Sequence, residues 1–158
     1  MLRVNRIINN QSYKSCLERL SEFEKDRIFC RHNMEHFLDT ARIMYITVLE
    51  NNLPIKKDVV YATALLHDIG RVLQYENGTP HHRASADFAR DILPNCGFSK
   101  EETDEIVRAI LSHRSDEDGS TLGSLLYLAD KKSRLCFNCR AEKDCYWSSE
   151  KKNREIEV

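Results

Sequence analysis

Residues 59–70 read Val-Val-Tyr-Ala-Thr-Ala-Leu-Leu-His-Asp-Ile-Gly, and this stretch decides the fold. Its first eight residues are apolar on nearly every side, which is typical of a helix or a strand buried in a core. The two alanines, Asp58 at the position of an N-cap and Gly70 as a stop favour a helix over a strand. We therefore expect a central core helix that ends at His67 and Asp68.

Apolar residues at helical spacing continue on both sides of this stretch. The sequence predicts further helices at about 12–30, 33–50, 82–93, 99–113 and from 122 past 130. Pro54 and Pro94 should end two of these units, because proline cannot donate a backbone hydrogen bond. Ser99 and Glu102 match a capping box at the start of another helix. The predicted fold is an all-α, single-domain bundle of about six helices.

A chain of 158 residues, 41% of them hydrophobic and 31% charged, suits one globular domain. Residues 1–134 would form the helical domain, and residues 135–158 a Cys-rich segment with a charged tail that packs on it or extends from it. The net charge of −1 gives no general attraction to nucleic acid or to an anionic membrane. Without a long apolar run or a signal peptide, a cytoplasmic protein is expected, and an oligomer is possible.

Six residues with metal-binding side chains are spread over five of these segments. They are His36, His67, Asp68, His82, His113 and Asp130. Imidazole nitrogen and carboxylate oxygen are ligands of Zn²⁺, Mn²⁺ and non-haem iron at catalytic sites. Helical bundles build such centres from side chains on facing helices. If the six converge in the fold, the chain holds a catalytic metal site.

A different interpretation fits some of these residues when each is taken alone. A single histidine on an apolar face, such as His36 or His113, is most often a packed or surface residue. The two carboxylates, Asp68 and Asp130, differ because each follows an apolar run, where a buried charge needs a positive partner. A salt bridge to Arg42 or Arg108 could serve one of them, whereas a metal explains the whole set.

The order and local contexts of these residues resemble the HD-domain superfamily of metal-dependent phosphohydrolases. His36-Phe-Leu-Asp-Thr-Ala-Arg resembles the segment with that family's first histidine, and Leu-Leu-His67-Asp68-Ile-Gly resembles its HD motif in the HDIG form. His82-Arg-Ala-Ser-Ala, Ala-Ile-Leu-Ser-His113 and Tyr-Leu-Ala-Asp130-Lys resemble the remaining segments. The resemblance spans about residues 30 to 134, and small stand-alone bacterial HD proteins are the nearest comparison.

The resemblance implies a metal site, a reaction and roles for these residues. The first four ligands, His36, His67, Asp68 and Asp130, would bind one divalent metal, and His82 and His113 would bind a second. His81 stays open as the alternative to its neighbour His82. The metal would be Fe, Mn, Zn, Co, Ni or Mg. With one metal only, His82 and His113 would contact phosphate or transfer protons.

The implied activity is hydrolysis of a nucleotide, or of a related phosphate ester or pyrophosphate, through a metal-activated hydroxide. Asp68, His82 and His113 would be its catalytic residues, and the substrate would be a small phosphorylated molecule. The alternative is a non-catalytic HD-type sensor that binds a nucleotide or a metal. Arg31, Arg71 and Lys131 are candidate phosphate-binding residues, because a cationic side chain can pair with phosphate oxygens. His32 has no assigned role and is expected at the surface.

A second group of metal-binding side chains lies near the C-terminus. Cys136-Phe-Asn-Cys139 is followed by Cys145, and a Cys-x-x-Cys pair fits half of a zinc or iron–sulfur site. Three cysteines are one short of a closed tetrahedral centre, so Cys16, Cys30, Cys96 or a histidine would have to supply the fourth ligand. A disulfide or a set of free thiols is also compatible with the pattern. Free thiols are narrowly favoured, since no fourth ligand is visible locally.

Overall fold

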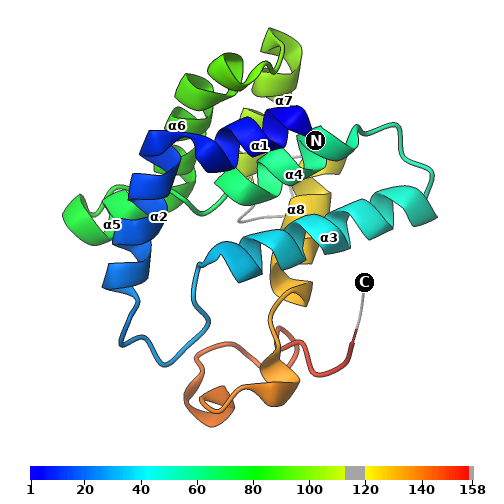
Figure 1. Cartoon of the computed structure of the whole chain (residues 1–158). Helices are drawn as coiled ribbons and strands as arrows, with labels where there is room; N and C mark the ends of the chain where they lie inside the picture. Colours follow the sequence, from blue (N-terminus) through cyan, green and yellow to red (C-terminus); the bar gives the residue numbers. More distant parts are fainter. Residues whose placement is uncertain (113–119, 157–158) are drawn as a thin grey trace.

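The computed structural model of the protein describes residues 1–112 and 120–156, which contain helices, turns and loops but no strand. The all-α prediction is confirmed (Figure 1). The α-helices of the described residues are α1 (Leu2–Asn9), α2 (Gln11–Phe23), α3 (Met34–Glu50), α4 (Lys57–Leu66), α5 (Arg71–Asn77), α6 (His81–Cys96), α7 (Lys100–Ser112) and α8 (Thr121–Lys132). Two 3₁₀ helices follow, η2 (Cys136–Asn138) and η3 (Glu142–Asp144). None of the described helices is long and apolar enough to cross a membrane.

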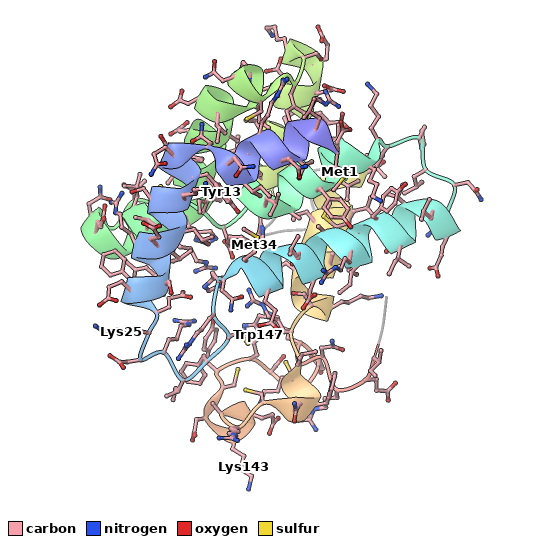
Figure 2. The ribbon with its side chains drawn as sticks, viewed as in Figure 1. Met1, Tyr13, Lys25, Met34, Lys143 and Trp147 are labelled. Carbon is pink, nitrogen blue, oxygen red and sulfur yellow. The ribbon has the colours of Figure 1, made fainter. Side chains whose placement is uncertain are left out.

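Helix α4 lies at the centre of the bundle, as its sequence predicts. It contacts α1, α3, α6, α7 and α8 (Figure 1). Leu65 and Leu66 are fully buried, and burial of each such side chain contributes about 1.5–3 kcal/mol. Tyr13 of α2 is buried as well and donates a hydrogen bond to the Leu65 carbonyl at 3.1 Å (Figure 2). The core therefore fixes the end of α4, where the HDIG motif begins.

The structure differs from the predicted helices at several boundaries. The bundle has eight α-helices in the described residues rather than about six, because α1 and α5 are short elements without a long apolar period. The first predicted helix ends at Phe23, so residues 24–33 form a loop. Pro94 lies inside α6 rather than ending it. Pro94 cannot donate the usual backbone hydrogen bond to the carbonyl of residue 90, and α6 ends two residues later at Cys96, before Gly97 at φ 92°.

The two predicted helix caps have different outcomes. Lys56 rather than Asp58 is the N-cap of α4, and Asp58 accepts a 2.6 Å hydrogen bond from Arg3 of α1. The capping box of α7 is confirmed. The Glu102 backbone N–H donates to the Ser99 hydroxyl at 3.3 Å, and the Ser99 N–H donates to the Glu102 carboxylate at 3.0 Å.

Gly70 follows Asp68 by two residues, but it does not act as the left-handed helix stop that the sequence suggested. Its φ is −69°, which any residue can adopt. Glycine is needed there because α6 comes very close. An added Cβ would lie 2.3 Å from the Ser85 nitrogen and 2.6 Å from the His81 oxygen. The Gly70 N–H also donates to the Ser85 hydroxyl at 2.8 Å. Gly70 thus lets the start of α6 pack directly against the HDIG turn.

We expect Gly70→Ala to lower the free energy of unfolding by about 1–3 kcal/mol, because backbone atoms of α6 would have to move. Urea unfolding followed by circular dichroism measures this loss. Gly78→Asn is the control, because Gly78 has φ 79° with open space around it and Asn tolerates that conformation. Equal stability of the Gly70→Ala variant and the unchanged protein would contradict the proposed close packing.

Candidate metal centre

Four of the predicted ligands meet at one place in the structure. His36 lies in the first turn of α3, His67 and Asp68 follow the end of α4, and Asp130 lies in α8. One ligand atom from each of these residues lies within 4.8 Å of those of the other three. Three elements that are far apart in the sequence therefore converge on one cluster of two imidazoles and two carboxylates.

Hydrogen bonds orient both histidines of this cluster. His67 is fully buried, and its Nδ1 donates to the Ala64 carbonyl at 2.7 Å, so its Nε2 faces the Asp130 carboxylate at 3.7 Å. The Ser133 hydroxyl donates to the Asp130 carbonyl at 2.7 Å, and its oxygen lies 3.0 Å from His36 Nδ1. The Nδ1 of His36 is therefore a donor, and its Nε2 faces Asp130 at 3.2 Å. Such fixed outer partners are typical of metal-binding histidines.

The Asp68 carboxylate is the most enclosed charge of the site. Its side chain is 1% exposed, and the Nε2 atoms of three histidines lie 3.3–3.5 Å from its oxygens, namely those of His32, His67 and His81. The Nδ1 atom of each of the three has its own partner: a Glu24 oxygen, the Ala64 carbonyl and the Gln74 amide oxygen. The Nε2 lone pairs can therefore be directed toward Asp68. Nitrogen acceptors that face a buried carboxylate in this way could bind a cation together with it.

The electrostatics of the cluster also favour positive charge. Burial opposes ionisation of Asp130, but its close contacts with His36 and His67 and the charge of Arg134 hold its pKa well below the usual value. Burial likewise disfavours protonated His67, yet Asp68 and Asp130 raise its pKa. The guanidinium of Arg134 lies 3.2 Å from Asp130 and 2.9 Å from His36 Nε2. Two imidazoles and two carboxylates are ligand types that suit a divalent transition metal.

His32 and its partner Glu24 are site residues that the sequence did not reveal. The expectation that His32 lies at the surface is wrong, since its side chain is 6% exposed. Both its Nδ1 and its backbone nitrogen lie 2.6 Å from the Glu24 carboxylate. Burial opposes ionisation of Glu24, but hydrogen bonds from His32 and Tyr75 lower its pKa to about 2. Both residues lie in the loop of residues 24–33, where the sequence has no regular spacing of apolar residues that would indicate a buried face.

The structure places His81 rather than His82 against Asp68. His81 is buried, and its Nε2 lies 3.3 Å from Asp68 Oδ1. His82 is half-buried, with its ring nearly perpendicular to that of His81 and 5.8 Å away between centroids. His113 lies outside the described residues. The assignment of His82 and His113 to a second metal therefore stays a prediction.

The three basic candidates have different positions. Arg71 belongs to the site, because its Nε lies 3.0 Å from the Asp68 carboxylate. Arg31 is exposed and donates to the backbone carbonyl of Lys25 at 2.7 Å. Lys131 lies over the ring of Tyr127. The structure directs the last two side chains to partners outside the four-residue cluster.

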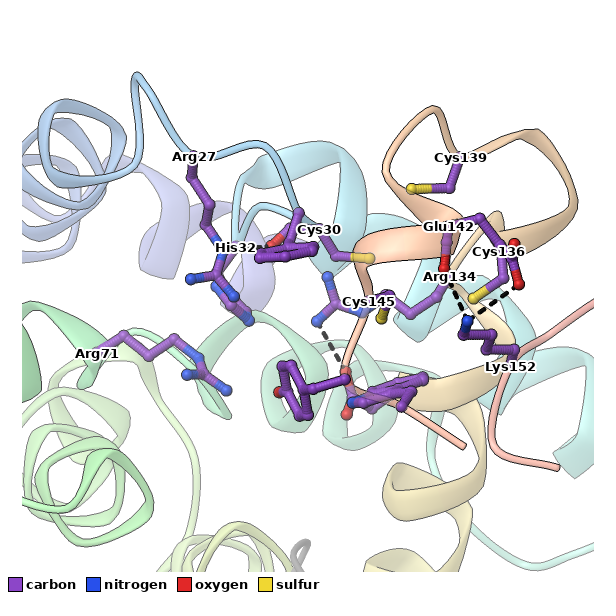
Figure 3. A pocket seen from close by; sticks show the side chains of 14 residues that line it. Arg27, Cys30, His32, Arg71, Arg134, Cys136, Cys139, Glu142, Cys145 and Lys152 are labelled. Carbon is purple, nitrogen blue, oxygen red and sulfur yellow. Dashed lines mark hydrogen bonds and ion pairs between the residues drawn. The ribbon is translucent and has the colours of Figure 1, made fainter. Parts of the chain in front are cut away.

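A cavity of about 90 Å³ adjoins the cluster and separates it from the Cys-rich segment, residues 135–156. Asp130, His32 and Arg71 line it beside the cluster, and Arg27 and Arg134 add positive charge. Figure 3 shows Arg27, His32 and Arg71 toward one end and the cysteines toward the other. The site therefore combines a possible metal position with a cationic cavity that suits an anion.

Comparisons with known proteins agree with this geometry. Residues 33–142 match the family model described as HD domain. An uncharacterized protein of Clostridium beijerinckii is 47% identical over 156 residues, which covers 99% of each chain. A crystal structure described as a predicted HD superfamily hydrolase, from an uncultured Thermotogales bacterium, aligns with a TM-score of 0.67 at 21% identity. The alignment covers 90% of this chain and 79% of that one.

We expect the protein to bind Mn²⁺ or Fe²⁺, and Asp130→Asn or His67→Ala to weaken this binding more than tenfold, since each removes one of four ligands. Competition with a chelator measures the affinity. A metal concentration 100 times the Kd should stabilise the unchanged protein by about 2.7 kcal/mol. Asp39→Asn is the matched control, because Asp39 is partly exposed on α3 and pairs with Arg42. Equal affinity in the ligand variants and the control would contradict this metal site.

We expect Glu24→Gln to weaken metal binding by about tenfold while the helical content is retained, because His32 would lose the carboxylate that orients it beside Asp68. The same chelator competition measures the effect. Glu18→Gln, an exposed change on α2, should leave the affinity as it is. An unchanged affinity in Glu24→Gln would show that His32 does not act through Asp68.

Proposed function

Because the chain belongs to the HD domain family, we propose that it is a metal-dependent phosphohydrolase. Its proposed substrate is a nucleotide or a related phosphate ester or pyrophosphate. The observation that carries this proposal is the cluster of His36, His67, Asp68 and Asp130 beside a cationic cavity. The description of the aligned crystal structure as a predicted HD superfamily hydrolase supports the same class of reaction.

The charge of the cavity supports a phosphate group as the substrate's anchor. Arg27, Arg71 and Arg134 line it, and a guanidinium can bind two phosphate oxygens at once. Arg71 also contacts Asp68, and Arg134 contacts Asp130. A phosphate held by these two arginines would therefore lie next to the proposed metal ligands. Arginines in this position would also stabilise negative charge that develops on the phosphoryl oxygens.

A divalent metal in the four-residue cluster supplies Lewis acidity toward a phosphoryl oxygen and makes water more acidic. The protein's own residues prepare the site for this. The ionised carboxylates of Asp68 and Asp130 provide the charge that retains a cation, and the backbone partner of His67 keeps its Nε2 directed inward. Glu24 holds His32 so that its Nε2 can accept a proton or a hydrogen bond beside Asp68. Enclosure by the Cys-rich segment limits the access of bulk water.

We expect protein loaded with Mn²⁺, Fe²⁺ or Co²⁺ to release phosphate or nucleotide from at least one member of a broad substrate panel. The panel includes nucleoside mono-, di- and triphosphates, dinucleoside polyphosphates and simple phosphomonoesters. Asp68→Ala should reduce the rate at least about a hundredfold, because both metal retention and charge stabilisation would be lost. Arg71→Ala should mainly raise the KM, whereas the control Asp39→Ala, which changes a partly exposed residue paired with Arg42, should match the unchanged protein.

Absence of turnover across the panel, with metal bound in stoichiometric amount, would contradict the proposed phosphohydrolase. If a nucleotide from the panel then raised the melting temperature without being cleaved, the chain would be a nucleotide-binding sensor instead. Metal analysis of the same preparation separates this result from a simple failure to load the site.

A further inference from the structure

Four cysteines from two distant parts of the chain line one cavity. Cys136, Cys139 and Cys145 belong to the Cys-rich segment, and Cys30 comes from the loop between α2 and α3. Figure 3 shows their sulfur atoms grouped at one end of the cavity. Cys30 is therefore the fourth cysteine beside these three, although it is far from them in the sequence. Cys16 lies on α2 and Cys96 at the end of α6, and neither lines this cavity.

The four thiols are near neighbours in a partly buried environment. Burial raises the pKa of Cys136, and the nearby thiols of Cys30, Cys145 and Cys139 raise it further. The four thiols therefore lie close enough to influence one another. All four are free thiols in the structure, so a disulfide does not account for their grouping.

The Cys-rich segment has almost no hydrophobic core of its own. Its buried apolar residues are Cys136 and Ala141, whereas Phe137 is 47% exposed and Tyr146 is 80% exposed. The backbone of this segment is stabilised by the short turns of η2 and η3 and by a few polar contacts. One of them is the hydrogen bond that the Asn153 side chain donates to the Lys132 carbonyl at 2.6 Å. A segment this small is usually held by disulfides or by a bound metal.

The spacing of the sulfur atoms distinguishes two kinds of metal centre. A single zinc ion holds four sulfurs at about 2.3 Å, which places all of them about 3.8 Å apart. Within the part of the chain that the structure describes, no three cysteine sulfurs gather within 4.8 Å of one another, whereas the His/Asp cluster does meet that limit. An iron–sulfur cluster distributes its four thiolates over two or more iron atoms, so no three of them need to lie that close together.

Positive side chains surround the same cavity. Arg27, Arg134 and Lys152 line it together with the cysteines. The Lys152 ammonium is largely buried and donates to the Glu142 carbonyl at 2.7 Å, within the turn that precedes Cys145. Nearby charge and hydrogen bonds stabilise the net negative charge of a cluster with four thiolate ligands.

We propose that Cys30, Cys136, Cys139 and Cys145 bind an iron–sulfur cluster that ties the Cys-rich segment to the loop between α2 and α3. The cluster would fix the wall of the cavity beside the candidate metal centre. This inference depends only on the cysteines and their surroundings, and it holds whether or not the protein hydrolyses phosphate compounds.

The test is purification of the full-length protein without oxygen, followed by visible absorption and by analysis of iron and acid-labile sulfide. The unchanged protein should be coloured and should contain at least about two iron and two sulfide per chain. Sulfide is the decisive measurement, since the His/Asp cluster can bind iron but not sulfide. Cys30→Ser and Cys139→Ser should each lose most of the colour and the sulfide, and the control Cys16→Ser should keep both.

Two further measurements keep the test independent of folding and of catalysis. Circular dichroism shows whether Cys30→Ser retains its helices, and limited proteolysis should cut this variant within residues 135–156. Asp68→Ala should keep its sulfide even if it is inactive, which separates this proposal from the proposed function. Protein with one zinc and no sulfide, a disulfide among the four cysteines, or four metal-free thiols would each overturn the iron–sulfur assignment.

Discussion

The buried carboxylate of Asp68 is the constraint around which the rest of the site is arranged. It lies at the end of a helix that the core encloses on every side, and its side chain is 1% exposed. A charge in that position is costly unless charged or polar partners reach it. Arg71 approaches from α5, His81 from α6 and His32 from the loop before α3. Gly70 allows His81 of α6 to come this close, because any larger residue at position 70 would push α6 away.

The direction of the histidine rings explains why this arrangement suits a metal better than a structural salt bridge. A salt bridge needs one cationic partner, and Arg71 already supplies it for Asp68. The structure nevertheless surrounds that carboxylate with imidazoles whose outer nitrogens are occupied by other partners. Side chains held so that several lone pairs converge are well placed to bind a cation. The arginines of the adjoining cavity add positive charge that would attract an anion to this place.

The sequence predicted what depends on periodicity and on short motifs. The all-helical class, the buried α4 and the capping box of α7 follow from local patterns, and the order of the His and Asp residues pointed to the family. Glu24 and the buried position of His32 were missed, and Cys30 could not be chosen among the possible fourth ligands, because these residues lie in or beside an irregular loop whose partners are set by tertiary packing alone. Asp58 was misread as a cap for a related reason, since its true partner, Arg3, is 55 residues away.

The loop between α2 and α3 connects the two candidate metal sites physically. Cys30 faces the other cysteines, and His32, two residues later, faces Asp68. A second connection runs through Arg134, which contacts Asp130, donates to the Arg31 carbonyl at 3.1 Å and precedes Cys136 by two residues. A shift of the thiols would therefore move groups that touch both carboxylates of the His/Asp cluster. The Cys-rich segment is for this reason part of the site's architecture, because its three cysteines and Cys30 line the same cavity as His32 and Arg134.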